Sequence, residues 1–398
     1  MVRFERPSGV GVMRGLDALS KAVACGAALA LICGAVAART TARQPHYPPA
    51  QQVGAAQPPV VVRRSPETLG FVVTKFWHSM VEEPNCPDGM NLSMSEVILS
   101  QAAPAERARL QTPAAQTELK RRSMYNDQGK SICMNPESVQ APPLSLVHGS
   151  QTAPGLDLDG MGSMRVPSAK GCAHQDFADS SGKARIDNQL FRINGCIRGF
   201  RFGGVYHQGA DAEMRNGSYA ILLEVSGVDD RVNDPHVDVA VYSSLDPTPF
   251  SAKGVPLPNG SLTVHPDRRY WAKTSGRIVN GVLTTEPFDL VLAVPIATVK
   301  TEFTFREARI QLKLKPDGSA EGVLAGYYPI DSYYQNQVTY LGYKFFGDGA
   351  ANAGGFTCTA LHRALQQQAD GLRDPRTGVC HGISTAMMVS AVPAFVQK

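Results

Sequence analysis

Oxygen-bearing side chains gather between Gly155 and Gly199, and these residues are the ones in the sequence best suited to chemistry. Hard cations such as Ca²⁺ bind about six to eight oxygens from carboxylates, amides and backbone carbonyls, and glycines permit the sharp turns that bring such groups together. We therefore expect a calcium site in this stretch. Its candidate ligands are Asp157, Asp159, Asp176, Asp179, Asp187 and Asn188.

The spacing of these acids does not follow the EF-hand loop, because the twelfth position counted from Asp176 is Asp187 instead of glutamate. A structural alternative therefore stays open. The first acids would form turns with their own backbone, and Asp187 and Asn188 would cap a helix starting at Gln189 or join a backbone network. A melting temperature that rises with Ca²⁺ and falls with EDTA separates the two interpretations.

Cysteine usage predicts disulfides. The chain has eight cysteines, of which Cys25 and Cys33 fall in an apolar N-terminal stretch. The remaining ones are Cys86, Cys133, Cys172, Cys196, Cys358 and Cys380. An even number in an oxidising compartment predicts disulfides, and closeness in sequence favours the pairs Cys86–Cys133, Cys172–Cys196 and Cys358–Cys380.

The N-terminal stretch has the pattern of a signal peptide. Four basic residues precede an apolar run from Ala22 to Ala38, which contains the small-residue triplet Ala35-Val36-Ala37. The run is shorter than the roughly 20 residues of a spanning helix, so cleavage is favoured over a membrane anchor. We expect residues 1–37 to be removed, no transmembrane segment to remain, and the mature protein to be periplasmic or secreted. Met13 is an alternative start.

The rest of the chain divides into three regions. Residues 38–65 are rich in Pro, Gln and Ala and predict a disordered linker. Residues 66–200 predict a small Cys/Asp-rich region with short helices. There, a capping box at Ser93–Glu96 starts one helix and Pro104 opens a second helical stretch. The segment Gly70–Trp77 predicts either a strand or a buried turn of helix.

Residues 201–398 predict an antiparallel β domain, since apolar residues alternate with polar ones from Ser218 onward. Hairpin signals occur at Asn259-Gly260, Asn280-Gly281 and Asp317-Gly318. The predicted strands are 219–225, 237–242, 282–294, 302–305, 308–314 and 322–325, with a helix at 359–369 and an edge strand at 391–396 around Pro393. The fold class is mainly β: an antiparallel β-sandwich or a partly closed barrel, with short helices in the N-terminal region and one C-terminal helix.

The order of several motifs carries a resemblance. These motifs are Cys86-Pro-Asp-Gly, Cys133-Met-Asn-Pro, Leu156-Asp-Leu-Asp-Gly, Cys172-Ala-His, Asp176-Phe and Ile186-Asp-Asn-Gln-Leu, ending at Gly195-Cys196. In this order they resemble a group of uncharacterised exported bacterial proteins. The resemblance implies that residues from about Gly70 to Gly199 form a recurring unit, and it assigns no catalytic residue.

Two further surfaces are candidates for binding. Tyr328, Tyr333 and Tyr334 lie among amide and acidic residues, and tyrosine offers both an apolar face and a hydroxyl to a sugar ring or a protein partner. The alternative places them at the rim of the core. The acidic loop from Asp229 to Asp238 is a second candidate, with an ordinary solvated hairpin loop as its alternative.

Function is best narrowed by the motifs that the sequence lacks. It has no GxSxG elbow, HExxH helix, P-loop or Rossmann glycine pattern. The net charge is +4 without a basic cluster, so we expect no nucleic-acid partner. We therefore expect an exported, disulfide-bonded cell-envelope protein, a binding or structural module with Ca²⁺ as its candidate cofactor, whose partner is an envelope protein or a carbohydrate. The alternative is a secreted or periplasmic hydrolase of glycosides or esters.

Overall fold

A computed structural model describes residues 65–148, 151–160, 172, 174–216, 219–294, 301–340 and 354–398. The predicted signal peptide, residues 1–37, lies outside the described residues. The same holds for the predicted linker, apart from its last residue.

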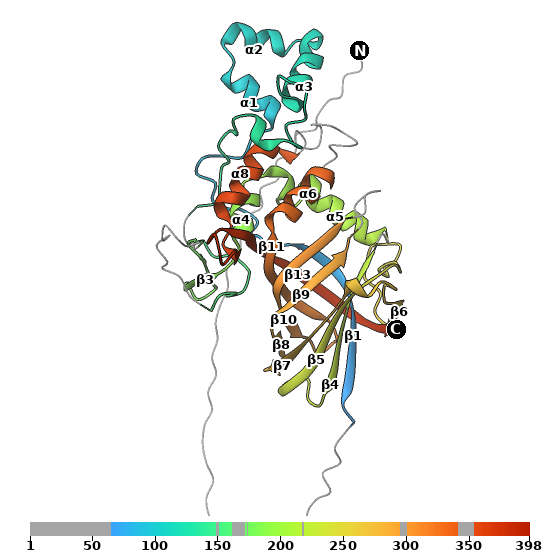
Figure 1. Ribbon diagram of the computed structural model, residues 1–398. Coiled ribbons are helices and arrows are strands. Elements are labelled where there is room, and N and C mark those ends of the chain that lie inside the picture. Colours follow the sequence, from blue (N-terminus) through green and yellow to red (C-terminus); the bar gives the residue numbers. More distant parts are fainter. Residues whose placement is uncertain are drawn as a thin grey trace, which may run out of the picture. The chain divides into compact units, whose positions relative to one another are not determined.

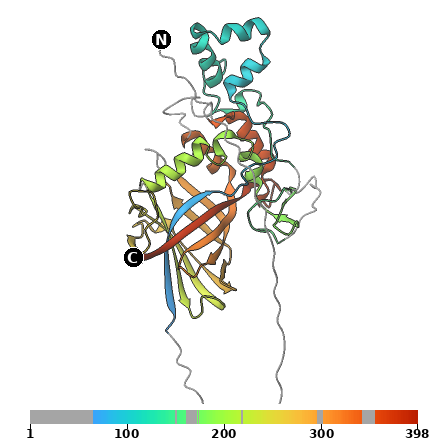
Figure 2. The ribbon, with the colours of Figure 1, turned by 180° about the vertical axis from the view of Figure 1, so that it is seen from behind.

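Eight antiparallel strands form a closed barrel (Figure 1), which confirms the mainly β prediction. In chain order they are β1 (Glu67–His78), β4 (Ala220–Val228), β5 (Asp234–Ser244), β7 (Trp271–Val279), β8 (Val282–Thr285), β10 (Glu302–Leu314), β11 (Ala320–Pro329) and β13 (Cys380–Gln397). Pairing of β1 with β13, from Phe71 opposite Pro393 to His78 opposite Met387, closes the ring. Figure 2 shows these two strands side by side, β1 in blue and β13 in red.

The shorter strands and the helices lie around this barrel. The remaining strands are β2 (Phe177–Ala178), β3 (Ala184–Ile186), β6 (Gly260–Thr263), β9 (Phe288–Ala293) and β12 (Gly371–Arg373). The helices are α1 (Met94–Gln101), α2 (Pro104–Leu110), α3 (Gln116–Met124), α4 (Gln189–Asn194), α5 (Val205–Arg215), α6 (Ile330–Tyr340) and α8 (Cys358–Gln368), with 3-10 turns at Pro113–Ala115, Pro136–Ser138, Arg198–Phe200 and Arg268–Tyr270. Helix α5 packs on β1, α6 on β10, β11 and β13, and α4 and α8 on β13.

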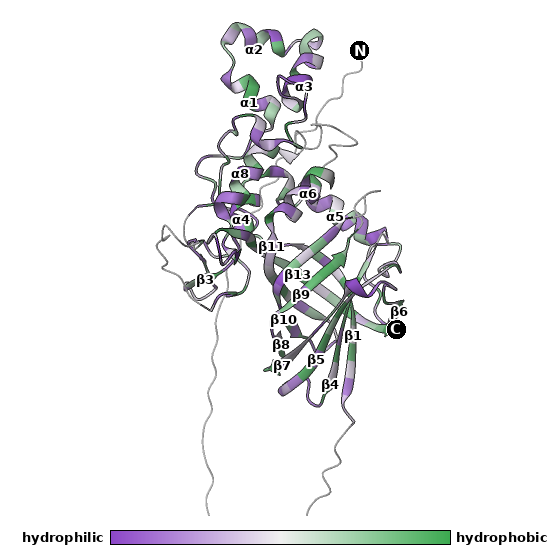
Figure 3. Cartoon of the chain, in the orientation of Figure 1, coloured by the Kyte–Doolittle hydropathy of each residue, from purple (hydrophilic) through white to green (hydrophobic). Residues whose placement is uncertain are grey.

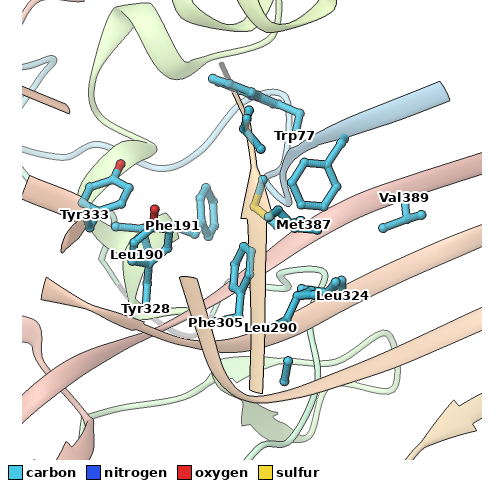
Figure 4. Packing of buried hydrophobic residues seen from close by; sticks show 14 of the residues in the cluster. Trp77, Leu190, Phe191, Leu290, Phe305, Leu324, Tyr328, Tyr333, Met387 and Val389 are labelled. Atoms are coloured by element: carbon cyan, nitrogen blue, oxygen red, sulfur yellow. The ribbon is translucent and has the colours of Figure 1, made fainter. Parts of the chain in front are cut away.

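Side chains fill the barrel interior. Alternation along β4 sends Leu223 into the main core, whereas its neighbour Leu222 joins a smaller cluster with Tyr242 and Leu262 on the opposite face of the sheet. Figure 4 shows Met387 between Trp77 and Phe305 in the main core. Near β6, strands β4 and β5 therefore bury apolar side chains on the inner and on the outer face of the barrel.

The N-terminal helices follow their local signals. Helix α1 starts with the predicted capping box, in which Ser93 and Glu96 bond each other's backbone amides. The stretch opened by Pro104 is interrupted at Pro113, so it forms α2 and α3 instead of one helix. Helix α3 is largely hydrophilic (Figure 3).

Several strand predictions need correction. The predicted strand 282–294 breaks at Pro287, which has no N–H for a ladder, so β8 and β9 pair with different halves of β10. The predicted strands 302–305 and 308–314 are one strand with a bulge where Glu307 has a φ of 51°. The turns at Asn280-Gly281 and Asp317-Gly318 do form hairpins.

The two predictions around Asn259 and Pro393 are wrong. Asn259-Gly260 leads into β6, which runs parallel to the end of β13, and makes no hairpin. Residues 391–396 belong to the long central strand β13. Pro393 is tolerated there because it falls between the pairing with β11, which ends at Ala391, and the pairing with β6, which begins at Ala394.

All six predicted disulfide cysteines are paired, but the predicted pairs are wrong. The bonds are Cys86–Cys196, Cys133–Cys358 and Cys172–Cys380, with sequence separations of 110, 225 and 208 between partners. The last two link the chain before residue 200 to α8 and to the start of β13. Cysteines close in sequence lie on different elements here, so their partners are set by the packing of the chain and not by loop length.

Candidate functional site

Three of the predicted metal ligands come together. One carboxylate oxygen from each of Asp157, Asp159 and Asp187 lies within 4.8 Å of the others. Asp159 is exposed, Asp157 is half-buried and Asp187 is buried, so the cluster opens to solvent on the Asp159 side. We call these three residues the Asp triad.

Backbone pairing positions the Asp triad. Asp187 directly follows β3, and its N–H donates to the carbonyl of Leu156 at 3.0 Å. In return, Oδ2 of Asp187 accepts the N–H of Leu158 at 2.7 Å and that of Asp159 at 3.3 Å. Asp157 Oδ1 accepts the N–H of Gly160 at 2.7 Å, and Gly160 takes a φ of 71°, which favours glycine. Each of these two aspartates thus uses one oxygen to fix the turn.

The surroundings of Asp187 disfavour an ionised carboxylate that has no positive charge beside it. Burial raises its pKa to about 8, the Leu158 amide opposes this shift, and the charges of Asp176, Asp370 and Asp159 add to it. The carboxyl group therefore keeps a proton at neutral pH unless a positive charge takes its place. A bound cation would supply that charge.

The other predicted ligands have different roles. Asp179 Oδ1 accepts the N–H of Ser181 at 2.8 Å and its hydroxyl at 2.6 Å, and Oδ2 pairs with Arg185 at 2.7 Å. The side-chain amide of Asn188 donates to the carbonyls of Ser79 and Pro154, both at 3.0 Å. Asp176 is buried beside the Asp triad but is not one of its three members.

A buried polar network lies next to the Asp triad around the start of α4. Asn188 occupies the N-cap position, but Ser384 Oγ on β13 accepts the N–H of Gln189 at 2.9 Å instead. Asp370 Oδ1 accepts the N–H of Ser384 at 2.6 Å, and burial raises the pKa of Asp370 to about 7. Sequence reasoning missed Asp370 and Ser384, since no motif connects them with Asp187.

Arg192 is the buried cation of this network. Its guanidinium donates to the carbonyls of Val147 at 2.9 Å and Gln175 at 2.7 Å, and lies 4.4 Å from the ring centre of Phe177. Desolvation lowers its pKa, while Asp176 and Asp370 oppose that shift. The sequence around Arg192 does not predict its burial, because arginine is usually exposed.

A groove of about 700 Å³ runs beside the Asp triad. Asp157 belongs to the Asp triad and also lines the groove. The opposite wall of the groove is the outer face of the barrel. The polar lining residues include Arg185, Thr284, Arg309 and Gln311. Arg309 Nη1 donates to the carbonyl of Asp157 at 2.8 Å, which ties the barrel wall to the turn of the Asp triad.

The two other predicted binding surfaces have structural roles. Tyr328, Tyr333 and Tyr334 are at most 4% exposed, and their hydroxyls bond Glu302 O, Asn194 and Cys133 O respectively, so they form no exposed platform. In the Asp229–Asp238 loop, the carboxylate of Asp234 accepts three backbone N–H groups and closes the turn between β4 and β5.

Comparison with models of known protein families, with curated proteins and with solved structures gives no match for this chain. Among the described residues, no helix has the length and apolar character needed to cross a membrane.

Proposed function

We propose that this protein is an exported, disulfide-bonded module of the cell envelope, with a binding or structural role, whose Asp triad holds Ca²⁺. One observation carries the calcium assignment: carboxylates from two segments, around Asp157 and at Asp187, converge within 4.8 Å. The three long-range disulfides support export, because such bonds persist in oxidising compartments.

The donor set favours a hard cation. All three groups are carboxylates, which suit Ca²⁺ better than the nitrogen and sulfur ligands that zinc prefers. Water or an oxygen of a partner would complete the coordination. Calcium in this place would also neutralise the buried carboxyl of Asp187.

Thermal unfolding of the mature protein in Ca²⁺ and in EDTA tests the proposal. We expect Ca²⁺ to raise the melting temperature of the wild type, because it binds the folded state alone. Asp187→Asn should keep the backbone contacts of Oδ2 and lose the response. The matched control is Asp179→Asn, since Asp179 lies in the same segment but is engaged with Arg185 and Ser181.

The control also guards against a general effect of divalent ions on this acidic segment. Asp179→Asn should respond to Ca²⁺ as the wild type does. Equal melting temperatures of the wild type in Ca²⁺ and EDTA, or an undiminished response in Asp187→Asn, would contradict the calcium assignment.

The groove beside the Asp triad supports a polar partner such as a carbohydrate. Its arginine, threonine and amide side chains offer donors and acceptors to sugar hydroxyls. A carbohydrate array should therefore show binding that Gln311→Ala in the groove weakens. The exposed Gln335, on α6, supplies the control Gln335→Ala.

Pull-downs from envelope extracts and activity panels complete this test. An envelope-protein partner would be recovered together with the mature chain and would replace the carbohydrate as the ligand. Turnover of chromogenic glycosides or esters by the purified protein would contradict a binding or structural role.

A further inference from the structure

The groove of about 700 Å³ beside the Asp triad has a regular wall on its barrel side. Thr284 on β8 and Val323 on β11 both pair with Gln311 on β10, so the three side chains form one row on the outer face of the barrel. Neighbouring strands lie about 4.8 Å apart, which gives the row a length of roughly 10 Å. The row offers a hydroxyl, an amide and an apolar side chain. Such a mixture suits sugar rings, which carry hydroxyl groups at their edges and C–H groups on their faces.

Arg309 adds a positive charge to the same wall. It lies two residues before Gln311 on β10, so it shares the outer face, and it is half-buried. Its Nη1 donates to the carbonyl of Asp157 at 2.8 Å. In the part of the chain that the structure describes, this is the only hydrogen bond of the guanidinium, and no carboxylate pairs with it. Charges drawn out of water are normally paired, so Arg309 points to an anion in the groove.

The second arginine of the groove, Arg185, is already neutralised. Its Nε donates to Asp179 Oδ2 at 2.7 Å. Hydrogen bonds from Ser181, the Lys183 amide and Arg185 hold the pKa of Asp179 well below its usual range, so this partner stays charged. Of the two arginines that line the groove, Arg309 is therefore the one that lacks a counter-charge.

The charges around Arg309 balance when calcium is bound. The Asp triad carries three negative charges in its ionised form, and Ca²⁺ offsets two of them. Arg309, which bonds the backbone of Asp157, offsets the third. Ca²⁺ takes about six to eight oxygens, so one from each aspartate leaves positions for other oxygen donors. An acidic ligand would thus meet two cationic centres and no net negative charge.

We propose that the groove binds a chain of uronic acids, a carbohydrate whose sugars carry carboxylates, with one carboxylate held by Arg309 and by the Ca²⁺ of the Asp triad. It rests on the proposed function, since it needs the calcium site. The planar guanidinium matches a carboxylate with two parallel N–H donors. The row at Gln311 contacts the neighbouring sugar hydroxyls. A neutral chain meets the same row but lacks the charged anchor.

Calorimetric titration of the full mature chain tests the proposal, with trigalacturonate and its methyl ester as probes. The ester keeps the sugar rings and removes their charges. In CaCl₂ we expect trigalacturonate to bind at least tenfold more tightly than the ester, and at least tenfold more tightly than it does in EDTA. Arg309→Gln should weaken trigalacturonate binding at least tenfold, as expected for a lost charge-assisted hydrogen bond. The matched control is Arg185→Gln, which should bind as the wild type does because Arg185 is engaged with Asp179.

The melting temperature separates this proposal from the calcium assignment. A rise with Ca²⁺ in both the wild type and Arg309→Gln would show that fold and calcium site are intact in the variant. With that rise present, equal binding of trigalacturonate and its ester, or equal affinity of Arg309→Gln and Arg185→Gln, would overturn the uronate proposal and leave the calcium site standing. Equal affinity for trigalacturonate in CaCl₂ and in EDTA would also overturn it. In case Arg309→Gln folds poorly, the comparison of the two probes on the wild type decides.

Discussion

The barrel and the segment between β1 and β4 are stabilised in different ways. The barrel strands run for up to 18 residues and bury a continuous apolar core. The segment from residue 79 to residue 200, here called the cysteine-rich segment, has short elements, such as strands of two and three residues. It also contains four of the six paired cysteines and the buried charged side chains of Arg192, Asp176 and Asp187.

This difference shows how covalent and polar links replace regular structure. Ladder hydrogen bonds to both neighbours hold a barrel strand along its length, whereas an irregular segment needs individual contacts to fix its conformation. Two disulfides tie the cysteine-rich segment to α8 and β13, and the side chains of Asn188 and Arg192 satisfy backbone carbonyls within it. The Asp triad belongs to this cross-linked part. Its geometry therefore depends on those links.

The largest expected effect is the loss of a disulfide. The double variant Cys133→Ser/Cys358→Ser opens a link between residues 225 apart and should lower the free energy of unfolding by about 5 kcal/mol in the chain-entropy model. Chemical denaturation measures the loss. Hydrogen exchange should show reduced protection in the cysteine-rich segment and retained protection in the barrel. Equal loss of protection in the cysteine-rich segment and in the barrel would contradict the idea that the two regions are stabilised in different ways.

A core substitution in the barrel should act globally. Phe305 is fully buried, so Phe305→Ala should lower the free energy of unfolding by about 4 kcal/mol through lost burial and a cavity. Protection should fall throughout the chain, because the cysteine-rich segment packs on the same core. Phe395→Ala is the control: Phe395 is 59% exposed, and its removal should change stability little. Similar losses for both variants would contradict the assigned core.

The buried acids should make apo stability fall with rising pH. Asp187 has a pKa of about 8 when folded, against about 4 in an unfolded chain. Between these values the folded state holds a proton that the unfolded state has lost, so the free energy of unfolding decreases as pH rises from about 4 through 8. Denaturation in EDTA at several pH values should show this slope.

Asp187→Asn sharpens that measurement, since it removes the titrating group and keeps the acceptor. The slope should become shallower but not vanish, because Asp370, with a pKa of about 7, titrates in the same direction. In saturating Ca²⁺ the wild type should lose less stability with pH than in EDTA. An identical slope in wild type and Asp187→Asn would contradict a buried, proton-holding Asp187.

The smallest effect is expected at the surface of α2 and α3. Arg109 bridges Glu106 and Glu118, each at 2.8 Å, but all three side chains are more than a third exposed. Such pairs contribute little. Arg109→Gln should leave the denaturation midpoint unchanged within error. A clear shift would mean that this charged cluster contributes to the links that hold the cysteine-rich segment.

The barrel could be predicted further from the sequence than the site. Alternation in β4, β5 and β11, and the turns at Asn280-Gly281 and Asp317-Gly318, are local signals, and antiparallel hairpins follow from them directly. Closure of the ring depends on β1 meeting β13 across almost the whole chain, and no local pattern encodes that contact.

The candidate site was predicted only in part for the same reason. Asp157 and Asp159 were expected to act with Asp187, and a single backbone bridge at Leu156 brings them together. Asp370 and Ser384 reach this place only because β13 passes beside α4. The disulfide partners were missed because they are close in space and far apart in sequence.

A crystal structure of the mature protein grown with CaCl₂ is the decisive test of calcium binding at the Asp triad. We expect an ion with oxygens of Asp157, Asp159 and Asp187 at about 2.3–2.6 Å, and an anomalous signal that identifies calcium. Density at these residues that shows only water, in crystals saturated with Ca²⁺, would contradict it.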